Sequence, residues 1–253
     1  TLSSPAIAAA IEPGQFVHMK IPGMEGHVLR RPFSVYAADA AGGTLDVLYQ
    51  TVGFGTNHLA ALAPDVANEI ESAEFIGPVG RRWQAPAGTQ RALLVGGGVG
   101  AAPLFMLCQE LVGSGVHVDV VLGAQTADAL VCLKRYEQLL SRDVRVATDD
   151  GTLGREGFCT SLVEEALAAG VDDPGFFQHR VLIDRIGQGH PGLLYGGLVD
   201  KFKVTVFLGS LACLGGRQAG NGEDGAFRGF HDRLVSGVHA LLKGLGPQDA
   251  VAL

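Results

Sequence analysis

Hydrophobic residues in the first third of the chain occur in short runs, and turn-forming residues separate these runs. Gly, Pro, Asn and Asp fill the separating segments, which is the usual composition of tight turns. Strands this short and this evenly spaced predict a small antiparallel β barrel or sandwich. The runs that we expect to form strands are residues 15–21, 31–37, 44–52 and 69–77.

The pattern changes after residue 91, where continuous apolar runs begin to alternate with segments of helical periodicity. Leu104, Leu107, Cys108 and Leu111, for example, recur at the spacing of one helix face. Strands that alternate with helices predict a parallel sheet with right-handed crossovers. The expected strands are residues 91–97, 117–124 and 144–148, and the expected helices are residues 102–115, 128–140 and 158–170.

A segment containing Pro and Gly at residues 84–90 separates the two patterns and is typical of a linker. We therefore expect one domain over residues 1–88 and a second domain over residues 89–172. From residue 173 to residue 253 the pattern that predicts strands and helices becomes weak, because glycine is frequent and only short segments such as 203–209 keep any hydrophobic periodicity. We treat residues 173–253 as a divergent tail.

Charge and cysteine usage narrow the range of partners. The formal net charge is −7 and Lys and Arg never cluster beyond a pair, which argues against nucleic acid or an anionic membrane as a partner. The uncharged run at residues 92–109 contains four glycines and Pro103, so we expect no membrane span there. Residues 1–10 lack the pattern of a secretion signal, and four scattered cysteines indicate reduced thiols, so we expect a cytoplasmic protein.

The segment LLVGGGVGAAPL, residues 93–104, joins a predicted strand to a predicted helix. Gly96, Gly98 and Ala101 satisfy the G-x-G-x-x-G/A pattern, in which missing side chains let backbone amides approach a pyrophosphate at a helix N-terminus. The alternative is a glycine-rich turn that only packs tightly. The dinucleotide pattern also expects an acidic residue after the next strand, where this chain has Gln125 and Thr126.

A second loop, TDDGTLG at residues 148–154, follows the third strand of this half. Open parallel sheets bind ligands at the carboxyl ends of their strands, so Asp149 and Asp150 are candidates for hydrogen bonds to a ribose or a nicotinamide. The alternative is a polar turn that caps the next helix.

The segment LRRPFSVY, residues 29–36, places a basic pair beside Pro, Phe and Ser on one predicted strand. Arg31 offers a planar fork for a phosphate, Phe33 a ring face and Ser34 a hydrogen bond to a heterocycle edge. The alternative is an ordinary strand with a surface arginine. Gly55 and Thr56 stand at an expected helix start, which either binds a phosphate or serves as a cap.

Seven segments, taken together and in order, resemble the ferredoxin-reductase-like flavoproteins, and among these the electron-transfer subunits of NAD-dependent dihydroorotate dehydrogenases. The resemblance covers about residues 12–170 and implies an antiparallel FAD-binding β barrel followed by a Rossmann-like, parallel-sheet NAD-binding domain. The segments are PGQFVHM, LRRPFSVY, LDVLYQTVGFGT, FIGPVGRRW, LLVGGGVGAAPL, VLGAQT and TDDGTLGREGFCT.

The resemblance also implies which residues bind each cofactor. Because the cofactors carry out the chemistry, no residue is assigned as a catalytic acid or base. FAD would contact Arg31, Pro32, Phe33, Ser34, Leu48, Tyr49, Gln50, Gly55 and Thr56. The NAD pyrophosphate would contact Gly96, Gly97, Gly98, Val99, Gly100 and Pro103, with Asp149 and Asp150 facing the same site.

In the family, a catalytic subunit containing FMN oxidises dihydroorotate, and electrons pass through a 2Fe–2S cluster to FAD and then to NAD⁺. The resemblance thus implies a role in pyrimidine biosynthesis, with that catalytic subunit as partner in a heterotetramer. The alternatives are a related reductase subunit serving ferredoxin or sulfide chemistry, and a redox-inert remnant.

The tail departs from the family. After Gly170 the chain has neither the family's Cys-Gly-Pro nor its C-x₄-C-x₂-C cluster motif, and Cys213 is the one cysteine there. The other three cysteines, Cys108, Cys132 and Cys159, fall on or beside predicted helices, where small thiols pack, so we expect no metal site. A shifted reading frame or other damage to the tail is our hypothesis for this break.

Overall fold

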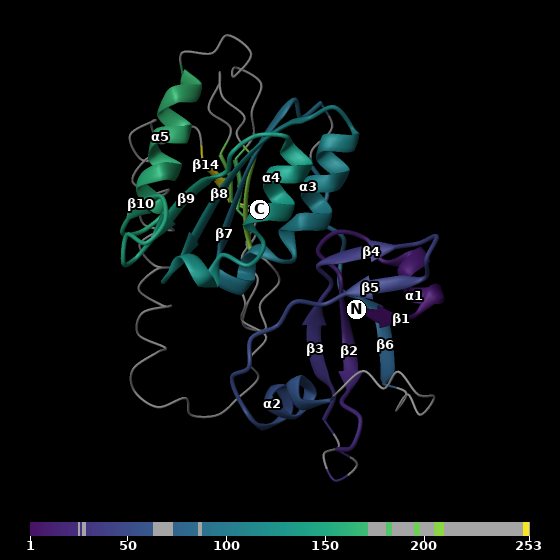
Figure 1. Cartoon of the computed structure of the whole chain (residues 1–253). Coiled ribbons are helices and arrows are strands. Elements are labelled where there is room, and N and C mark those ends of the chain that lie inside the picture. The colour runs from purple at the N-terminus through teal and green to yellow at the C-terminus, as the bar shows by residue number, and fades with distance from the viewer. Residues whose placement is uncertain are drawn as a thin grey trace. The chain divides into compact units, whose positions relative to one another are not determined.

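The computed structural model describes residues 1–24, 26, 29–62, 73–85, 88–171, 181–183, 195–197, 205–209 and 250–252. The chain separates into two compact units (Figure 1). The first comprises Thr1–Gln84 with Ala102–Leu107, and the second comprises Ala85–Ala101 with Cys108–Leu253. No helix within the described ranges is long and apolar enough to cross a membrane.

Antiparallel strands make up the first unit. In its described part, one three-stranded sheet has the order β1-β5-β4 and another has the order β3-β2-β6. The antiparallel architecture predicted from the sequence is therefore confirmed. The strands are β1 (Leu2–Ser3), β2 (Phe16–Lys20), β3 (Arg31–Ser34), β4 (Ala37–Asp39), β5 (Thr44–Asp46) and β6 (Glu74–Val79), and the helices are α1 (Pro5–Ala10) and α2 (Phe54–Ala61).

Two of the expected strands differ from the observed ones. The run at residues 31–37 divides between the sheets, because β3 ends at Ser34 and the chain crosses to β4 through the buried residues Val35 and Tyr36. The run at residues 44–52 pairs only as far as Asp46, after which the chain leaves the sheet and runs on to α2. Residues 69–72 of the last expected strand lie outside the described residues, and β6 covers its remainder.

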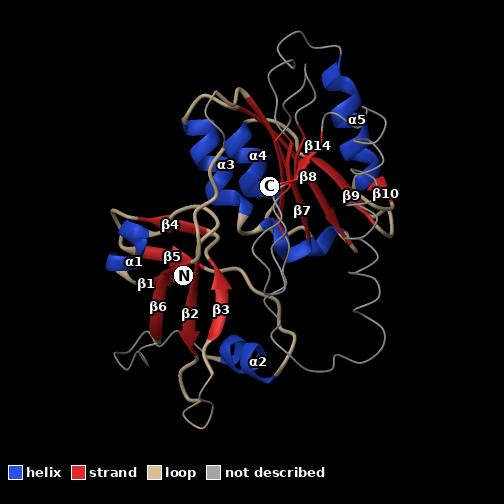
Figure 2. Cartoon of the chain, turned by 180° about the vertical axis from the view of Figure 1, so that it is seen from behind, coloured by secondary structure: helices blue, strands red, loops and turns tan. Residues whose placement is uncertain are grey.

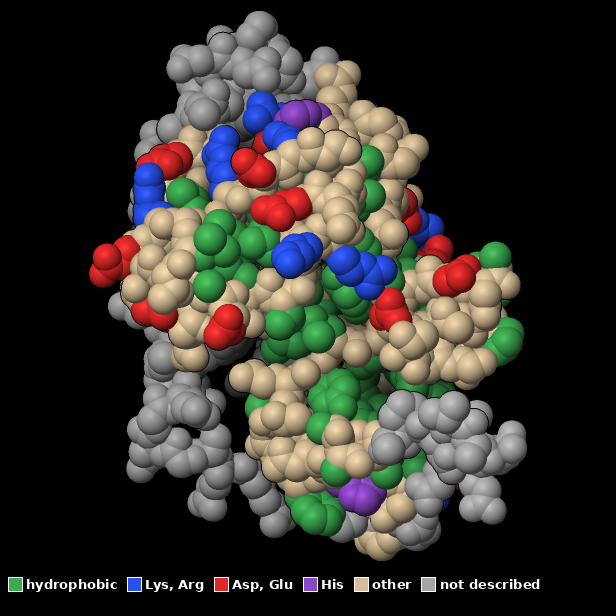
Figure 3. Space-filling model, in the orientation of Figure 1, with side chains coloured by type: hydrophobic (Ala, Val, Ile, Leu, Met, Phe, Trp, Pro, Cys, Tyr) green, Lys and Arg blue, Asp and Glu red, His purple; other side chains and the backbone are tan. Residues whose placement is uncertain are grey.

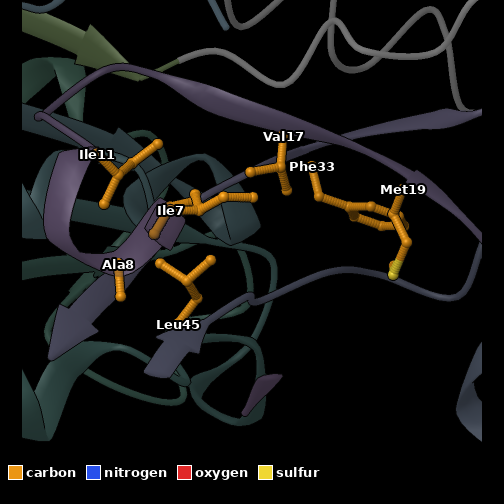
Figure 4. Packing of buried hydrophobic residues seen from close by; sticks show 8 residues of the cluster. Ile7, Ala8, Ile11, Val17, Met19, Phe33 and Leu45 are labelled. Carbon is orange, nitrogen blue, oxygen red and sulfur yellow. The ribbon is translucent and has the colours of Figure 1, made fainter. Parts of the chain in front are cut away.

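The hydrophobic core of the first unit shows the period-two burial of a half-exposed strand. Val17 and Met19 of β2 are 0% and 1% exposed, whereas the alternate residues Phe16, His18 and Lys20 are only partly buried. Helix α1, which is too short and alanine-rich to give a periodic signal, packs against them. Figure 4 shows this cluster, which comprises Ile7, Ala8, Ile11, Val17, Met19, Phe33, Val35 and Leu45.

A parallel sheet forms the centre of the second unit. Its strand order in the described residues is β10-β9-β8-β7-β13, and every neighbouring pair is parallel. The strands β7 and β8 are buried almost throughout, as expected for a sheet covered on both faces. The strands are β7 (Arg91–Gly97), β8 (His117–Ala124), β9 (Arg145–Thr148), β10 (Arg155–Glu156) and β13 (Thr205–Gly209).

Helices lie on both faces of this sheet. Figures 1 and 2 show α3 and α4 on one face and α5 on the other. This arrangement follows from right-handed crossovers, because the chain moves from β7 through β8 to β9 and then returns past β7 to β13. The helices are α3 (Leu104–Gly113), α4 (Leu133–Leu140) and α5 (Thr160–Val171), and the 3₁₀ turns are η1 (Gly98–Ala101) and η2 (Ala127–Ala129).

The reversal of strand order at β7 has a functional meaning. Because β8 and β13 flank β7 on its two sides, the chain reverses its direction of winding there. In open α/β sheets, ligands bind beside the carboxyl ends of the strands at such a switch point. The carboxyl end of β7 is Gly97, at the start of the glycine loop.

The tail assigned to residues 173–253 supplies the strand on the far side of β7. β13 runs parallel to β7 with Gly209 opposite Gly96, and it matches the periodic segment at residues 203–209. A separate antiparallel sheet has the order β11-β12-β14. Its strands are β11 (Val181–Ile183), β12 (Tyr195–Gly197) and β14 (Ala250–Ala252).

A buried carboxylate joins the amino ends of the central strands. Asp119 of β8 lies 2.8 Å from Arg91 Nη2 and 3.2 Å from Arg142 Nη2, and its side chain is 12% exposed. Burial raises the pKa of Asp119 and is the largest single influence. The hydrogen bond from Arg91, together with the charges of Arg91, His117 and Arg142, outweighs it and lowers the pKa.

The Asp119→Asn variant tests this ion-pair network. Because the folded-state pKa lies below that of the unfolded chain, the network contributes its full stability above about pH 4 and loses it as the pH falls through the folded value. We expect Asp119→Asn to lower the free energy of unfolding by about 2 kcal/mol at pH 7. Urea unfolding from pH 7 to pH 3 measures this loss, with the exposed Asp128→Asn as control. A deficit that stays constant down to pH 3 would contradict the assignment.

Candidate functional site

Gly96 is glycine because the backbone of the loop folds back onto it. A Cβ atom at Gly96 would lie 2.7 Å from Ala101 Cα and 2.9 Å from Ala101 Cβ, closer than side chains approach one another. This contact brings the end of η1 against the carboxyl end of strand β7. For Gly96, the tight-packing interpretation of the sequence motif is sufficient.

Gly98 has a different reason to be glycine. Its φ is +52°, a left-handed conformation that side chains rarely adopt, and no atom lies within 4 Å of the position that a Cβ would take. The loop therefore turns at Gly98 beneath open space at the switch point of the sheet. Such a turn fits a phosphate, because backbone amides at a helix start attract anions.

The other residues of the motif surround this turn. Pro103 is buried just before the first residue of α3, where its missing N–H leaves no bond unmade. Gly97 and Val99 are half-buried and Gly100 is buried.

The loop after β9 is tied to the end of β8 by hydrogen bonds. The amide of Asp149 donates to the Ala124 carbonyl over 3.0 Å. The hydroxyl of Thr152 accepts from the amide of Ala127 over 2.9 Å and donates to Asp150 Oδ1 over 2.6 Å. The carboxyl ends of β8 and β9 thus form one connected edge, which carries the exposed side chains of Asp149 and Asp150.

The two aspartates of this edge have different roles. Asp150 accepts hydrogen bonds from the side chain and the backbone amide of Thr152, and these bonds hold the pKa of Asp150 below its ordinary value. The polar-turn interpretation therefore fits Asp150. Asp149 is exposed at the edge and stays the better candidate for a ligand contact.

In the first unit, Arg31 lies against the beginning of helix α2. A Cβ added at Gly55, in the first turn of α2, would be 3.5 Å from Arg31 Nε. Nη1 of Arg31 donates to the Leu29 carbonyl over 3.2 Å. A guanidinium fork beside a helix N-terminus combines two features that favour a phosphate group.

The neighbouring Arg30 is engaged elsewhere. Its Nη2 lies 2.7 Å from Glu74 Oε2 on β6, whereas no ion pair found among the described residues includes Arg31. The charge of Arg30 is thus balanced within the protein. Of the basic pair in the sequence, Arg31 is the residue suited to an external anion.

The remaining residues predicted to contact FAD differ in their burial and in their hydrogen bonds. Thr56 accepts from the amides of Val52 and Gly53 over 2.9 and 3.2 Å, so its hydroxyl serves as a cap for α2. Phe33 is 7% exposed, and its ring packs edge-on to Tyr49 within the core, so it offers no open ring face. Pro32, Ser34 and Leu48 are partly buried and Gln50 is exposed.

The cysteines of the described residues are buried thiols. Burial is the main cause that raises the pKa of Cys108 and of Cys159 to about 12, and Cys132 is buried as well. Thiols of this kind are poor metal ligands, because the ligand is the thiolate. No group of three or more His, Cys, Asp or Glu able to hold a metal occurs in the part of the chain that is described, and Cys213 lies outside it.

The sequence patterns did not predict which residues hold the two loops in place through hydrogen bonds. Thr148 and Thr152 hold the loop after β9, and Tyr136 of α4 donates to the Ala101 carbonyl over 2.7 Å. The one available signal was a Tyr on the apolar face of an amphipathic helix, which says nothing about its hydroxyl.

Curated relatives confirm the resemblance found in the sequence. The chain is 40% identical over 156 residues to the "Dihydroorotate dehydrogenase B (NAD(+)), electron transfer subunit" of Bacillus cereus strain Q1. The same holds for that of Bacillus anthracis strain A0248. Each match covers 60% of this chain and spans 57% of the length of the relative. No protein-family profile matches the chain.

Solved structures confirm the fold class. An NADH-dependent reduced ferredoxin-NADP oxidoreductase is 28% identical with a TM-score of 0.55, over 65% of this chain and 56% of that chain. A ferredoxin reductase of carbazole 1,9a-dioxygenase is 21% identical with a TM-score of 0.51, over 63% and 49%. The second similarity concerns the fold alone. Antiparallel sheets followed by a Rossmann-like parallel sheet are thus the shared architecture.

Arg31→Ala should weaken FAD binding about tenfold to a hundredfold. A charge-assisted hydrogen bond to phosphate contributes roughly 1.5–3 kcal/mol, and each 1.4 kcal/mol is a factor of ten in affinity. Equilibrium titration of the apoprotein with FAD measures this loss. Arg30→Ala is the matched control, because its guanidinium pairs with Glu74. Equal FAD affinity in the two variants would refute the assignment of Arg31.

Gly98→Val should lower the affinity for NADH at least tenfold and leave the FAD content unchanged. The branched side chain would enter the open space above the loop, where the pyrophosphate is expected. Gly115→Val is the matched control, since Gly115 also has a positive φ (+77°) and open surroundings but follows α3. Both variants place a branched residue in the left-handed region of backbone conformation. If Gly115→Val loses NADH affinity equally, the effect is strain and the phosphate interpretation fails.

Proposed function

We propose that this chain is an FAD-containing electron-transfer subunit that passes electrons from dihydroorotate oxidation to NAD⁺. The observation that carries the proposal is that each unit contains one element suited to bind a phosphate. Arg31 lies against α2 in the first unit, and the Gly98 turn opens at the switch point in the second. The relatives named as electron transfer subunits of dihydroorotate dehydrogenase B supply the direction of transfer.

The chain's own residues bind and orient in this proposal. Arg31 and the first turn of α2 hold a phosphate of FAD, and the ring of Tyr49 packs edge-on against Phe33 of the same strand as Arg31. The turn at Gly98 holds the pyrophosphate of NAD, and Asp149 lies on the adjoining edge. Bound FAD would supply two-electron exchange with the nicotinamide, so no acid or base from the protein is required.

The partner in this proposal is the catalytic, FMN-containing subunit in a heterotetramer of the pyrimidine pathway, in the cytoplasm. We assign no iron–sulfur cluster to the chain, because its sequence lacks the four-cysteine motif and its described cysteines are buried. Electrons from the partner would have to reach FAD without such a cluster on this chain. Iron and acid-labile sulfide analysis of anaerobically purified protein tests this part.

Flavin reduction tests the central activity. A purified protein that carries FAD, and whose flavin absorbance bleaches on anaerobic addition of NADH, supports the proposal. A colourless protein that also fails to bind added FAD would instead support a redox-inert remnant.

The similarity to an NADH-dependent reduced ferredoxin-NADP oxidoreductase favours a second candidate, a ferredoxin-linked reductase. Faster oxidation of the reduced flavin by ferredoxin than by NAD⁺ would decide for it.

The edge beside the glycine loop favours NAD over NADP. Asp128, Asp149 and Asp150 are exposed there, and residues 124–131 and 148–154 contain no Lys or Arg. The additional 2′-phosphate of NADPH would meet like charges and no basic partner. Repulsion of this kind is long-ranged and weakened by salt.

We therefore expect NADH to reduce the flavin with a KM about tenfold to a hundredfold lower than that of NADPH at low ionic strength. The ratio of the KM for NADPH to the KM for NADH should fall in 0.5 M salt, at which the Debye length is only about 4 Å. It should also fall in the double variant Asp128→Asn, Asp149→Asn. Steady-state reduction of an artificial acceptor measures both constants. A ratio near one, or one insensitive to salt and to the variant, would contradict this account of the edge.

A further inference from the structure

Tyr136 is a buried residue whose hydroxyl reaches the end of the glycine loop. It lies in the middle of α4, is 0% exposed, and donates to the carbonyl oxygen of Ala101 over 2.7 Å. Ala101 is the last residue of η1 and is separated from Tyr136 by 35 positions in the sequence. Helix α4, which covers one face of the sheet, therefore holds the end of the loop through this hydrogen bond.

Ala101 is held on two sides. The absent side chain of Gly96 lets its backbone settle onto β7, where a Cβ would come within 2.7 Å of Ala101 Cα. Tyr136 restrains the carbonyl of Ala101 by a hydrogen bond. The backbone amide of Phe105 donates to the neighbouring carbonyl, that of Ala102, over 3.0 Å. The two ends of the loop, Gly96 and Ala101, are thus fixed, and the four residues between them must connect these ends. They do so with the left-handed turn at Gly98.

From this geometry we infer that Tyr136 is a positioning residue, which pre-organises the glycine loop for the pyrophosphate of the dinucleotide. The inference rests on the proposed function of that loop. A phosphate binds tightly to a loop when several amides already converge on one point, because ordering them during binding would oppose association. The Tyr136 hydroxyl removes one way in which the loop can relax. Because Tyr136 is 0% exposed, it acts through the Ala101 carbonyl and not on a ligand directly.

The Tyr136→Phe variant removes the hydroxyl and keeps the buried ring. In the full-length protein we expect the dissociation constant for NADH to rise about threefold to tenfold, with the limiting rate of flavin reduction within twofold of the wild type. FAD content should not change. Stopped-flow reduction over a range of NADH concentrations separates the two quantities. Titration with ADP-ribose, which lacks the nicotinamide, measures the loop without any electron transfer.

Val118→Ala provides the matched control. Val118 is 2% exposed near the amino end of β8, where it pairs with Ala92, so its truncation destabilises the same unit at the end of the strand away from the loop. Equal loss of ADP-ribose affinity in the two variants, or an unchanged affinity in Tyr136→Phe, would overturn the inference. If the wild type binds ADP-ribose but NADH does not reduce its flavin, the proposed electron transfer fails. A weaker affinity of Tyr136→Phe for ADP-ribose would then still support the positioning role. A wild type that does not bind ADP-ribose overturns both.

Discussion

The contact between Gly96 and Ala101 sets the geometry on which the carboxyl edge of the second unit depends. Because no side chain fits between these two backbones, the chain turns within a few residues from a buried strand into helix α3. A larger residue at position 96 would push η1 away from β7. The turn at Gly98 would then lose its fixed place at the point where the strand order reverses.

Much of the fold was predictable from the sequence, for a physical reason. The buried strands at residues 91–97 and 117–124 were predicted with the bounds that the structure shows, because continuous apolar runs between glycine-rich turns leave few alternatives. Helix α1 was missed, since six residues with four alanines carry no periodicity. The pairing of β7 with β13 was also beyond local reasoning, because the partner lies more than a hundred residues away.

The candidate site was predictable in its residue types but not in the reason for each. Gly96 and Gly98 are indistinguishable in the sequence, yet one is required by packing and the other by backbone conformation. Arg30 and Arg31 are adjacent and identical, and only Glu74, distant in the sequence, separates their roles. The two candidate phosphate sites also differ in charge. A guanidinium supports the first, whereas the glycine loop relies on amides and shape.

The place of β13 has a consequence for how the protein is made. β7 and β8 can pair as soon as residue 124 has left the ribosome, but the other edge of β7 stays open until Gly209 has been synthesised. At typical translation rates of about 5–20 residues per second, the 85 residues between them (209 − 124) take roughly 4 to 17 s. Throughout this interval, a strand with five consecutive buried residues presents unpaired backbone groups to solvent or to other nascent chains. The nascent chain is therefore most exposed to misassembly, and most in need of chaperone protection, in the window between those two events.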